Sequence, residues 1–356
     1  MQSSYPYAID WAQDHVPAIL WSAHGGQEFG HALADVLFGV EAPAGRLTQT
    51  WYASAAELPD LLDYDIIAAD ATYLYFRGIP LYPFGHGLTY TTFAYSDLRC
   101  WAVDADGVRG EATEMDHDGQ IEVSLVVTNT GARASDEVVQ LYTRQQRSRV
   151  KQPLRQLRGF RRIHLAPGER MTVTFPLRAA DLAFWDVTRN RPVVEASRHS
   201  VMVGRSSSDI HQATTITVRG ERIPLRDALA EPIPAAGHDD YAGADLRDAS
   251  PTGGDTVSAA ESGAWIAFAQ VNFGNGAGAC RARVASRDDR TAVVTLRLDD
   301  PLQGSVIGTI RASCRGGRYA WVDAATALEG ARGVHDLYAV FGSAGVSLDS
   351  LAFSPR

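Results

Sequence analysis

The stretch YPFGHGLTYTTFAY, residues 82–95, marks the point at which the sequence changes its pattern. Helical and extended signals alternate in the residues before it. After it, short segments of alternating apolar and polar residues follow one another, separated by turns. The change predicts a partial α/β sandwich fragment at residues 1–95 followed by β-sandwich domains, and therefore a multidomain, mainly β protein.

The composition limits the classes of protein and of partner. A chain of 356 residues predicts two or three domains, and 45% hydrophobic with 21% charged residues is typical of folded globular proteins. A net charge of −9 disfavours nucleic acid or an anionic membrane surface as the main partner. No apolar run reaches the roughly 18 residues that span a bilayer. The N-terminus lacks the pattern of an export signal, so a cytoplasmic location is the default expectation.

The three cysteines match no zinc-binding spacing. Cys280 and Cys314 fall in one expected domain, where they either form a disulfide or remain thiols. Together with Cys100 they are interpreted as buried thiols, because cysteine behaves as a small apolar residue in protein cores.

One strand–helix–strand pattern precedes the change. The apolar run at residues 16–21 predicts a buried parallel strand, and apolar residues at helical spacing predict a helix over residues 28–38. Gly39 stands where a glycine commonly ends a helix. A second extended segment is expected at residues 47–51. A single unit of this kind cannot cover both faces of a parallel sheet, so we expect this region to be unstable by itself.

Two β-sandwich domains are expected after the change. In residues 97–208, alternation predicts strands at 121–128, 138–142, 171–177 and 199–204, which is typical of an immunoglobulin-like sandwich. Residues 209–238 are rich in proline and are expected to form a linker. Residues 239–356 predict a second sandwich, of jelly-roll type. Its expected strands are 265–268, 279–286, 291–298, 305–312, 335–341 and 348–353.

Several motifs of the first 95 residues occur in one order in a known enzyme family. They are AILW (18–21), GQEFGHALADVLFG (26–39), PAGRL (43–47), TW (50–51), TY (72–73) and PLYPFGHGL (80–88). With them, this segment resembles the end of the α/β sandwich domain of glycoside hydrolase family 3, which includes β-glucosidases and β-xylosidases. The family commonly has an arginine before the Thr-Tyr pair, where this chain has Ala71.

The two later domains carry resemblances of their own. Residues 97–208 resemble the fibronectin type III-like domain that follows this core in many such enzymes. The matching motifs are VTNTG (127–131), EVVQLY (137–142), PLRQLRGF (153–160), LAPGE (165–169) and VGRSS (203–207). Residues 239–356 resemble a family 6 carbohydrate-binding module, in which an asparagine is expected at the position of Ser347. Its motifs are GAWIAF (263–268), VNFG (271–274), RVAS (283–286), LRLD (296–299) and GVHDLY (333–338).

The resemblance implies a role in carbohydrate metabolism. Complete family members cleave O-glycosidic bonds of β-glucosides or β-xylosides with retention, using two carboxylates that both lie upstream of the matching segment. No catalytic residue is therefore assigned here. The implied partners are an oligo- or polysaccharide and a separate chain that carries the barrel. No cofactor is implied, apart from a structural calcium ion in the binding module. The alternatives are a non-catalytic carbohydrate-binding protein and one chain of a split glycosidase.

Acidic side chains of the first region invite a catalytic interpretation. Glu28 and Asp35 share one helix face, and Asp60, Asp63 and Asp65 lie in a polar loop. Solvation of a helix or loop is the preferred interpretation for all five. A metal site is not expected either, since His24, Glu28 and His31 lack the His-Glu-x-x-His spacing of a catalytic zinc helix.

Aromatic side chains of the last domain are the candidate sugar contacts, because the C–H faces of pyranose rings pack on aromatic rings. The candidates for carbohydrate binding are Tyr319, Trp321 and Trp265. Trp265 lies in an alternating segment, where burial in the core is the preferred interpretation. Tyr319 and Trp321 follow two glycines in an expected loop, and for them a core role and a ligand role are equally favoured.

Overall fold

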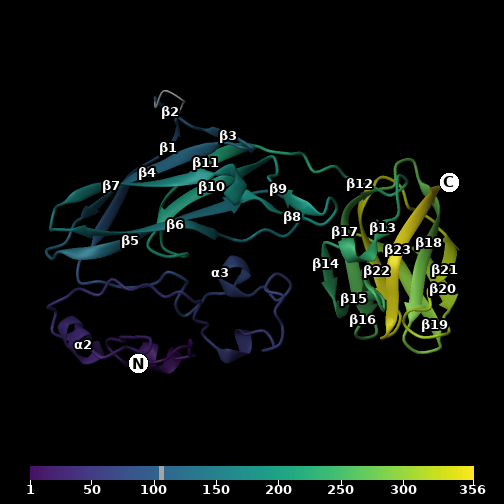
Figure 1. The fold of residues 1–356 in the computed structure, drawn as a ribbon, viewed down its shortest axis with the longest axis horizontal. Coiled ribbons are helices and arrows are strands. Elements are labelled where there is room, and N and C mark those ends of the chain that lie inside the picture. The colour runs from purple at the N-terminus through teal and green to yellow at the C-terminus, as the bar shows by residue number, and fades with distance from the viewer. Residues whose placement is uncertain (104–107) are drawn as a thin grey trace. The chain divides into compact units, whose positions relative to one another are not determined.

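The computed structural model describes residues 1–103 and 108–356 (Figure 1). They form two compact units, which are described separately. Unit 1 comprises Met1–Phe184 and Val193–Arg222, and unit 2 comprises Trp185–Pro192 and Ile223–Arg356. Most of the regular structure is β-strand in several sheets, which confirms the predicted multidomain, mainly β architecture.

The N-terminal region of unit 1 is built from short helices and irregular segments. The helices are α1 (Asp10–His15), α2 (Phe29–Leu37), the 3-10 helix η1 (Ala55–Glu57) and α3 (Thr72–Tyr75). Helix α2 confirms the predicted helix. Gly39 follows it with a left-handed φ of 74°, and its N–H donates to the carbonyl of Val36 at 3.1 Å. This glycine therefore ends the helix as expected.

The strand expected at residues 16–21 is absent, so that prediction is wrong. The described residues before β1 contain only isolated bridges, between Gln2 and Ser22 and between Trp51 and Tyr82. An extended apolar segment becomes a strand only where neighbouring strands accept its backbone hydrogen bonds. Aromatic packing orders this region instead, since Trp51 is buried against Trp21 and Tyr82, with ring centroids 5.8 and 5.9 Å away.

Unit 1 continues as a sandwich of two sheets, with strand orders β2-β1-β4-β7 and β3-β11-β10-β5-β6. Alternating apolar residues form its core, in which Val123 and Leu125 of β4 pack with Leu141 of β5 and Val201 of β10. Burial of each such side chain contributes about 1.5–3 kcal/mol. The strands are β1 (Phe93–Val103), β2 (Arg109–Glu111), β3 (Glu114–Asp116), β4 (Gln120–Asn129), β5 (Ser135–Gln145), β6 (Gln156–Leu165), β7 (Arg170–Arg178), β10 (Ser197–Gly204) and β11 (Ile210–Arg219).

A buried ion pair joins the N-terminal region to this sandwich. Arg46 Nη2 donates to both carboxylate oxygens of Glu137, at 3.1 and 3.2 Å. The hydroxyl of Tyr95 donates to Glu137 Oε1 at 3.0 Å. The Glu137 side chain is fully buried and that of Arg46 is 7% exposed. Because a buried charge without a partner is strongly unfavourable, this pair fixes the loop that contains Arg46 against the sandwich.

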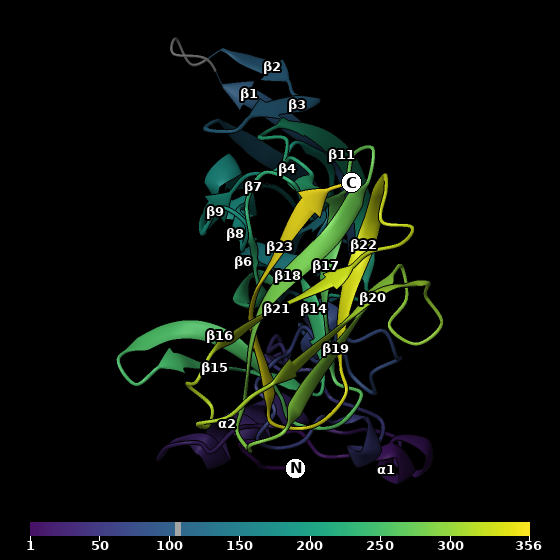
Figure 2. The ribbon, with the colours of Figure 1, turned by 90° about the vertical axis from the view of Figure 1, so that its right-hand side faces the viewer.

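Unit 2 is a second sandwich with two six-stranded sheets (Figure 2). One sheet has the order β12-β17-β22-β19-β20 with β14 beside β17, and the other has β15-β16-β23-β18-β21 with β13 beside β23. The strands are β12 (Arg226–Asp227), β13 (Ile233–Pro234), β14 (Asp240–Ala242), β15 (Ala244–Ser250), β16 (Gly253–Ala259), β17 (Trp265–Asn272), β18 (Ala277–Ser286), β19 (Thr291–Leu298), β20 (Val306–Ser313), β21 (Val322–Ala327), β22 (Val334–Phe341) and β23 (Val346–Pro355). The remaining elements of the chain are the 3-10 helices η2 (Ala179–Leu182) and η3 (Ala235–Gly237) and the two-stranded sheet of β8 (Phe184–Asp186) and β9 (Arg191–Val193).

The residues expected as a linker, 209–238, instead carry regular structure. Strand β11 pairs with β10 of unit 1, and β12 and β13 pair with β17 and β23 of unit 2. The prolines favoured the linker interpretation, but they all follow β11, whose alternating β-branched residues fit a strand. Pro234 takes part only in a two-residue pairing at β13, where a proline is tolerated.

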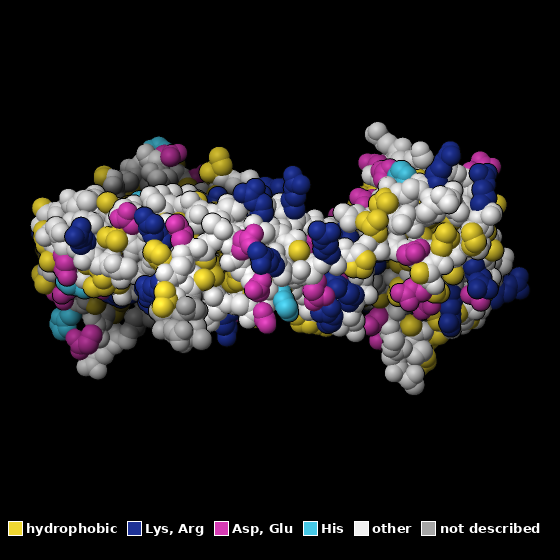
Figure 3. Space-filling model, turned by 90° about the horizontal axis from the view of Figure 1, so that it is seen from above, with side chains coloured by type: hydrophobic (Ala, Val, Ile, Leu, Met, Phe, Trp, Pro, Cys, Tyr) yellow, Lys and Arg dark blue, Asp and Glu magenta, His cyan; other side chains and the backbone are white. Residues whose placement is uncertain are grey.

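The cysteines are buried, and charged side chains lie on the surface. All three cysteines are buried free thiols, which confirms that interpretation over a Cys280–Cys314 disulfide. Burial raises the pKa of Cys280 to about 12. No helix of the described residues is long and apolar enough to span a membrane. On the face seen in Figure 3, basic and acidic side chains are interspersed.

Candidate functional site

A loop of unit 2 presents two of the three aromatic candidates. The loop connects β20 to β21, and Gly316 and Gly317 within it take left-handed φ values of 96° and 81°. Only glycine adopts such values at low cost, so the pair shapes the loop before Tyr319 and Trp321. Both rings are half-buried. The structure therefore places these two candidates together at the start of β21.

The Trp321 ring is held in a fixed orientation. Its Nε1 donates to the carbonyl of Ala249 at 2.9 Å, and the guanidinium of Arg283 lies 5.7 Å from the ring centroid. The guanidinium of Arg318 lies 4.6 Å from the Tyr319 centroid. Such contacts between a cation and a ring face contribute about 0.5–1 kcal/mol at exposed sites. A ring that is oriented in advance binds a flat sugar face at a lower cost in conformational entropy.

Trp265 lies elsewhere in unit 2. It begins β17, in the sheet opposite to the one that contains β21, and its ring makes an edge contact with Tyr338 at 5.4 Å between centroids. The ring is half-buried, whereas full burial in the core was the preferred interpretation. The strand register places Trp265 opposite Val340, so Tyr338 is its diagonal neighbour on the same face. The sequence analysis missed Tyr338, because only the register brings the two rings together.

The position at which the family module carries an asparagine is buried here. Ser347 belongs to β23 and is only 5% exposed. The polar groups near Trp321 are instead Arg283 and Asp349, whose Nε and Oδ2 atoms lie 4.0 Å apart. Arg283 and Asp349, and not the residue at 347, are therefore the polar side chains that lie on this part of the sheet.

The acidic residues of the N-terminal region are engaged locally. Glu28 Oε2 lies 2.6 Å from His31 Nδ1, and both side chains are exposed. Asp60 Oδ1 accepts the N–H of Leu62 at 2.9 Å, and Asp63 Oδ1 accepts that of Asp65 at the same distance. Such aspartates stabilise turns. None of these contacts places two carboxylates on either side of a substrate cleft.

The described residues offer no metal site. They contain no group of three or more His, Cys, Asp or Glu side chains suited to a metal ion. In unit 2, two acidic side chains make local contacts. Asp299 accepts from the N–H of Asp336 and contacts His335, and Asp336 accepts from the N–H of Gln270.

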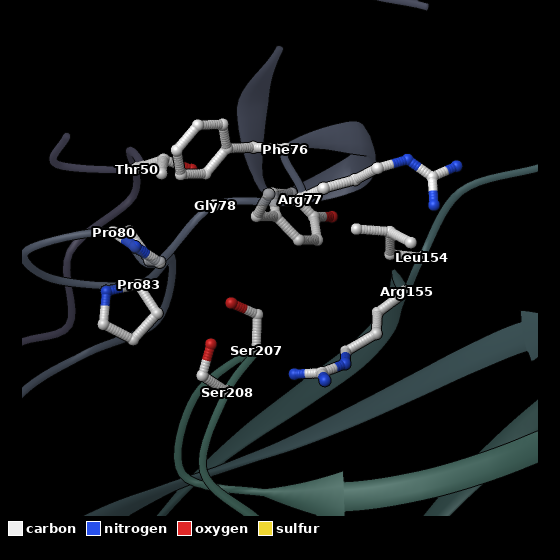
Figure 4. Close-up of a pocket in the computed structure, with 11 residues that line it drawn as sticks. Thr50, Phe76, Arg77, Gly78, Pro80, Pro83, Leu154, Arg155, Ser207 and Ser208 are labelled. Carbon is white, nitrogen blue, oxygen red and sulfur yellow. The ribbon is translucent and has the colours of Figure 1, made fainter. Parts of the chain in front are cut away.

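Unit 1 contains a pocket of about 180 Å³ between the N-terminal region and the loops of its sandwich (Figure 4). Its lining includes the aromatic residues Tyr73 and Phe76. Thr50, Arg155, Ser207 and Ser208 supply its polar groups. No sequence pattern predicted this pocket, because its residues come from four separate parts of the chain.

Family models match three consecutive parts of the chain. Residues 1–90 match the glycosyl hydrolase family 3 C-terminal domain, residues 137–207 the fibronectin type III-like domain, and residues 235–355 the family 6 carbohydrate binding module. Residues 1–90 correspond to a C-terminal portion of glycoside hydrolase family 3. The family 3 portion thus includes the helical N-terminal region, and the binding module coincides with the sandwich of unit 2. These matches confirm the resemblances that the motifs indicated.

The relatives of the family 3 portion are β-glucosidases. Thermostable β-glucosidase B of Acetivibrio thermocellus is 37% identical over 216 residues, and the probable β-glucosidase D of Aspergillus niger is 36% identical over 222 residues. Each match covers 58% of this chain, and 27% and 29% of the relatives. The crystal structure of β-glucosidase from Kluyveromyces marxianus in complex with glucose is 31% identical, with a TM-score of 0.52, over 61% of this chain and 26% of that one. The chain spans less than a third of these relatives.

Proposed function

We propose that this chain is the carbohydrate-binding portion of a family 3 glycoside hydrolase that acts on β-glucosides or β-xylosides. The observation that carries the proposal is the order of the three matched domains, which joins a family 3 segment to a sugar-binding module in one chain. Within the module, the oriented ring of Trp321 and the adjacent Tyr319 form the sugar contact. Trp265 with Tyr338 provides a second aromatic surface, on the opposite sheet.

The complete enzyme would hydrolyse the glycosidic bond with retention. That reaction uses one carboxylate as nucleophile and a second as acid and base, about 5–5.5 Å apart. Asp60 and Asp63 cap turns, Glu28 contacts His31, and Asp70 pairs with Lys151, so we assign no catalytic residue among them. Both catalytic carboxylates would come from a barrel-containing polypeptide.

Exposed apolar side chains in residues 1–90 support docking of that polypeptide. No residue of α1 or α2 is buried. Side chains that a folded domain normally covers are open to solvent, and such surfaces commonly mark interaction sites. They include Tyr5, Trp11, Leu37, Phe38, Val40, Leu58, Leu61, Leu62, Tyr64 and Ile79. The occupant that fits this surface is the α/β layer of a family 3 enzyme.

Replacement of Leu61 by aspartate tests this docking surface. Leu61 is 90% exposed, so the variant should change the thermal stability of the lone chain by no more than about 0.5 kcal/mol. It should weaken co-elution with a purified family 3 polypeptide that ends before the region matched by residues 1–90. Leu302→Asp, at a 75% exposed turn residue of unit 2, is the matched control and should leave co-elution unchanged. Equal co-elution of both variants and the parent would reject this surface.

Replacement of the loop rings tests the sugar site. On a glycan array, Trp321→Ala should bind β-linked glucans or xylans at least ~10-fold more weakly, because truncation of a central aromatic contact commonly has an effect of this size. Tyr319→Ala should weaken binding in the same direction. Trp321→Phe keeps a ring face and should retain most of the binding. Unchanged binding by the alanine variants would exclude these rings from the sugar site.

The two alternative functions differ in whether a second chain adds hydrolytic activity. If the chain is a non-catalytic carbohydrate-binding protein, its glycan binding should be complete without any partner, and Leu61→Asp should have no effect on any measured property. If the chain is half of a split glycosidase, hydrolysis of nitrophenyl β-glycosides should arise only when the barrel chain is added. The exposed apolar side chains of residues 1–90 favour the second alternative over the first.

A further inference from the structure

The pocket of unit 1 has polar groups that the fold leaves unused. Thr50 is 7% exposed, and its hydroxyl oxygen has no hydrogen-bond partner in the structure. A buried hydroxyl without a partner costs about 1–3 kcal/mol. Thr50 lines the pocket, so a ligand hydroxyl in the pocket would supply the missing hydrogen bond.

Two serines add hydroxyl groups to the same space. Figure 4 shows that the hydroxyl oxygens of Ser207 and Ser208 both point into the pocket. Ser207 is held in place by its backbone N–H, which donates to the carbonyl of Phe84 at 2.9 Å. Since hydroxyl groups both donate and accept hydrogen bonds, this side of the pocket suits a ligand with hydroxyl groups of its own.

The pocket has a positive charge that no protein carboxylate neutralises. Arg155 is half-buried, and among residues 1–103 and 108–356 the structure gives its guanidinium no carboxylate partner. Burial, and then repulsion from Arg144, lower the pKa of Arg155. An arginine remains charged at neutral pH nevertheless. Arg77, by contrast, directs its guanidinium away from the serines in Figure 4. Its Nε atom lies 3.8 Å from Asp70 Oδ1.

The two aromatic residues of the pocket lining contact their neighbours closely. Tyr73 stacks on Phe84 with ring centroids 4.2 Å apart, and its hydroxyl accepts the N–H of Leu157 at 3.2 Å. A Cβ atom at Gly78 would lie 2.4 Å from the ring of Phe76, so only glycine allows that ring its position. The volume of about 180 Å³ is below the roughly 300 Å³ at which sites for drug-sized ligands begin, and it suits one small ring.

We propose that this pocket binds a single sugar ring that carries a carboxylate, as a uronic acid does. The carboxylate binds Arg155, for which a planar guanidinium offers a two-point contact. The ring hydroxyls bind Thr50, Ser207 and Ser208, and a C–H face of the ring packs against Tyr73 or Phe76. The site lies in unit 1 and does not depend on the sugar site proposed for unit 2. The free monosaccharide and the end of a polysaccharide present the same chemistry.

Calorimetric titration of the full chain with sodium D-glucuronate tests the proposal. We expect saturable binding that is at least tenfold weaker in Arg155→Gln. Thr50→Val should also weaken binding, while its thermal stability stays equal to that of the parent or rises, because the variant removes an unsatisfied buried hydroxyl. Arg170→Gln, at an exposed residue of β7, is the matched control and should bind as the parent does. The difference between parent and variants reports on this pocket alone, whatever unit 2 binds.

Three comparison ligands separate the parts of the proposal. D-Glucose should bind at least tenfold more weakly than glucuronate, and equal binding would overturn the role of the charge. Inorganic phosphate that binds as tightly as glucuronate would overturn the role of the ring. A uronic acid trimer that binds as well as the monomer would assign the pocket to the end of a polysaccharide, and a trimer that fails to bind would assign it to the free monosaccharide. Equal binding of glucuronate to the parent and to both pocket variants, or no binding at all, contradicts the proposal.

Discussion

Replacement of Glu137 by alanine is expected to lower the free energy of unfolding of unit 1 by about 3–5 kcal/mol. The carboxylate is fully buried and is the charge partner of Arg46, whose side chain is 7% exposed. Arg205 Nε also lies 3.9 Å from Glu137 Oε1. In the variant, Arg46 would be a buried cation without its partner, and the hydroxyl of Tyr95 would lose its acceptor.

Urea unfolding followed by hydrogen–deuterium exchange of β5 peptides measures this loss in unit 1 alone. Asp136→Asn is the matched control, because Asp136 is the preceding residue on the same strand. Its partners Arg162 and His164 have side chains that are 65% and 67% exposed, so the control should cost no more than about 1 kcal/mol. Equal costs for the two variants would contradict the importance of the buried pair.

The second large effect is a pH dependence caused by His199. This histidine of β10 is 2% exposed, and neither ring nitrogen has a hydrogen-bond partner in the structure. Burial, with a smaller contribution from Arg158, lowers the pKa of His199 to about 4. Above pH 6.5 the imidazole is neutral in both folded and unfolded chains. As the pH falls from 6.5 to 4, the unfolded chain binds a proton that the folded chain excludes, so stability should fall by about 3 kcal/mol.

Hydrogen–deuterium exchange of peptides from β10, measured between pH 7 and pH 4, tests this loss of stability. The variant His199→Leu should lose less stability than the parent over that range, because it has no imidazole to protonate. His117→Leu, at an exposed histidine, should follow the parent profile. Parallel losses in the parent and in His199→Leu would show that other groups cause the pH dependence.

Local patterns predicted the parts of the fold whose signals lie in neighbouring residues. Alternation located β4, β7 and β19 to within a residue or two, because each buries one face in a sandwich core. Strand β6 was missed, since at the sheet edge it exposes Phe160 and Arg161 and does not alternate. The apolar run at 16–21 has the composition of a strand, but strand formation depends on neighbours that no local pattern reveals.

The candidate sites depend even more on the tertiary structure. The sequence indicated Tyr319 and Trp321 through two adjacent glycines, and the structure brings these residues together in one loop. The contact between the rings of Trp265 and Tyr338 depends on strand register. The pocket of unit 1 unites Thr50 with Arg155 and Ser207, which are more than fifty residues apart at each step. Sequence spacing carries no information about such contacts, because strand register and the packing of loops bring these residues together.

We propose that this chain recognises glycans through unit 2 and that the described residues do not by themselves cleave them. The most direct measurement is equilibrium dialysis of the full chain against labelled β-linked gluco- and xylo-oligosaccharides, with chromatography of the recovered sugar. We expect an oligosaccharide to be retained by the parent, to be retained less by Trp321→Ala, and to be recovered uncut. Recovery of shortened sugar from the chain alone, or equal retention by the parent and Trp321→Ala, would contradict the claim.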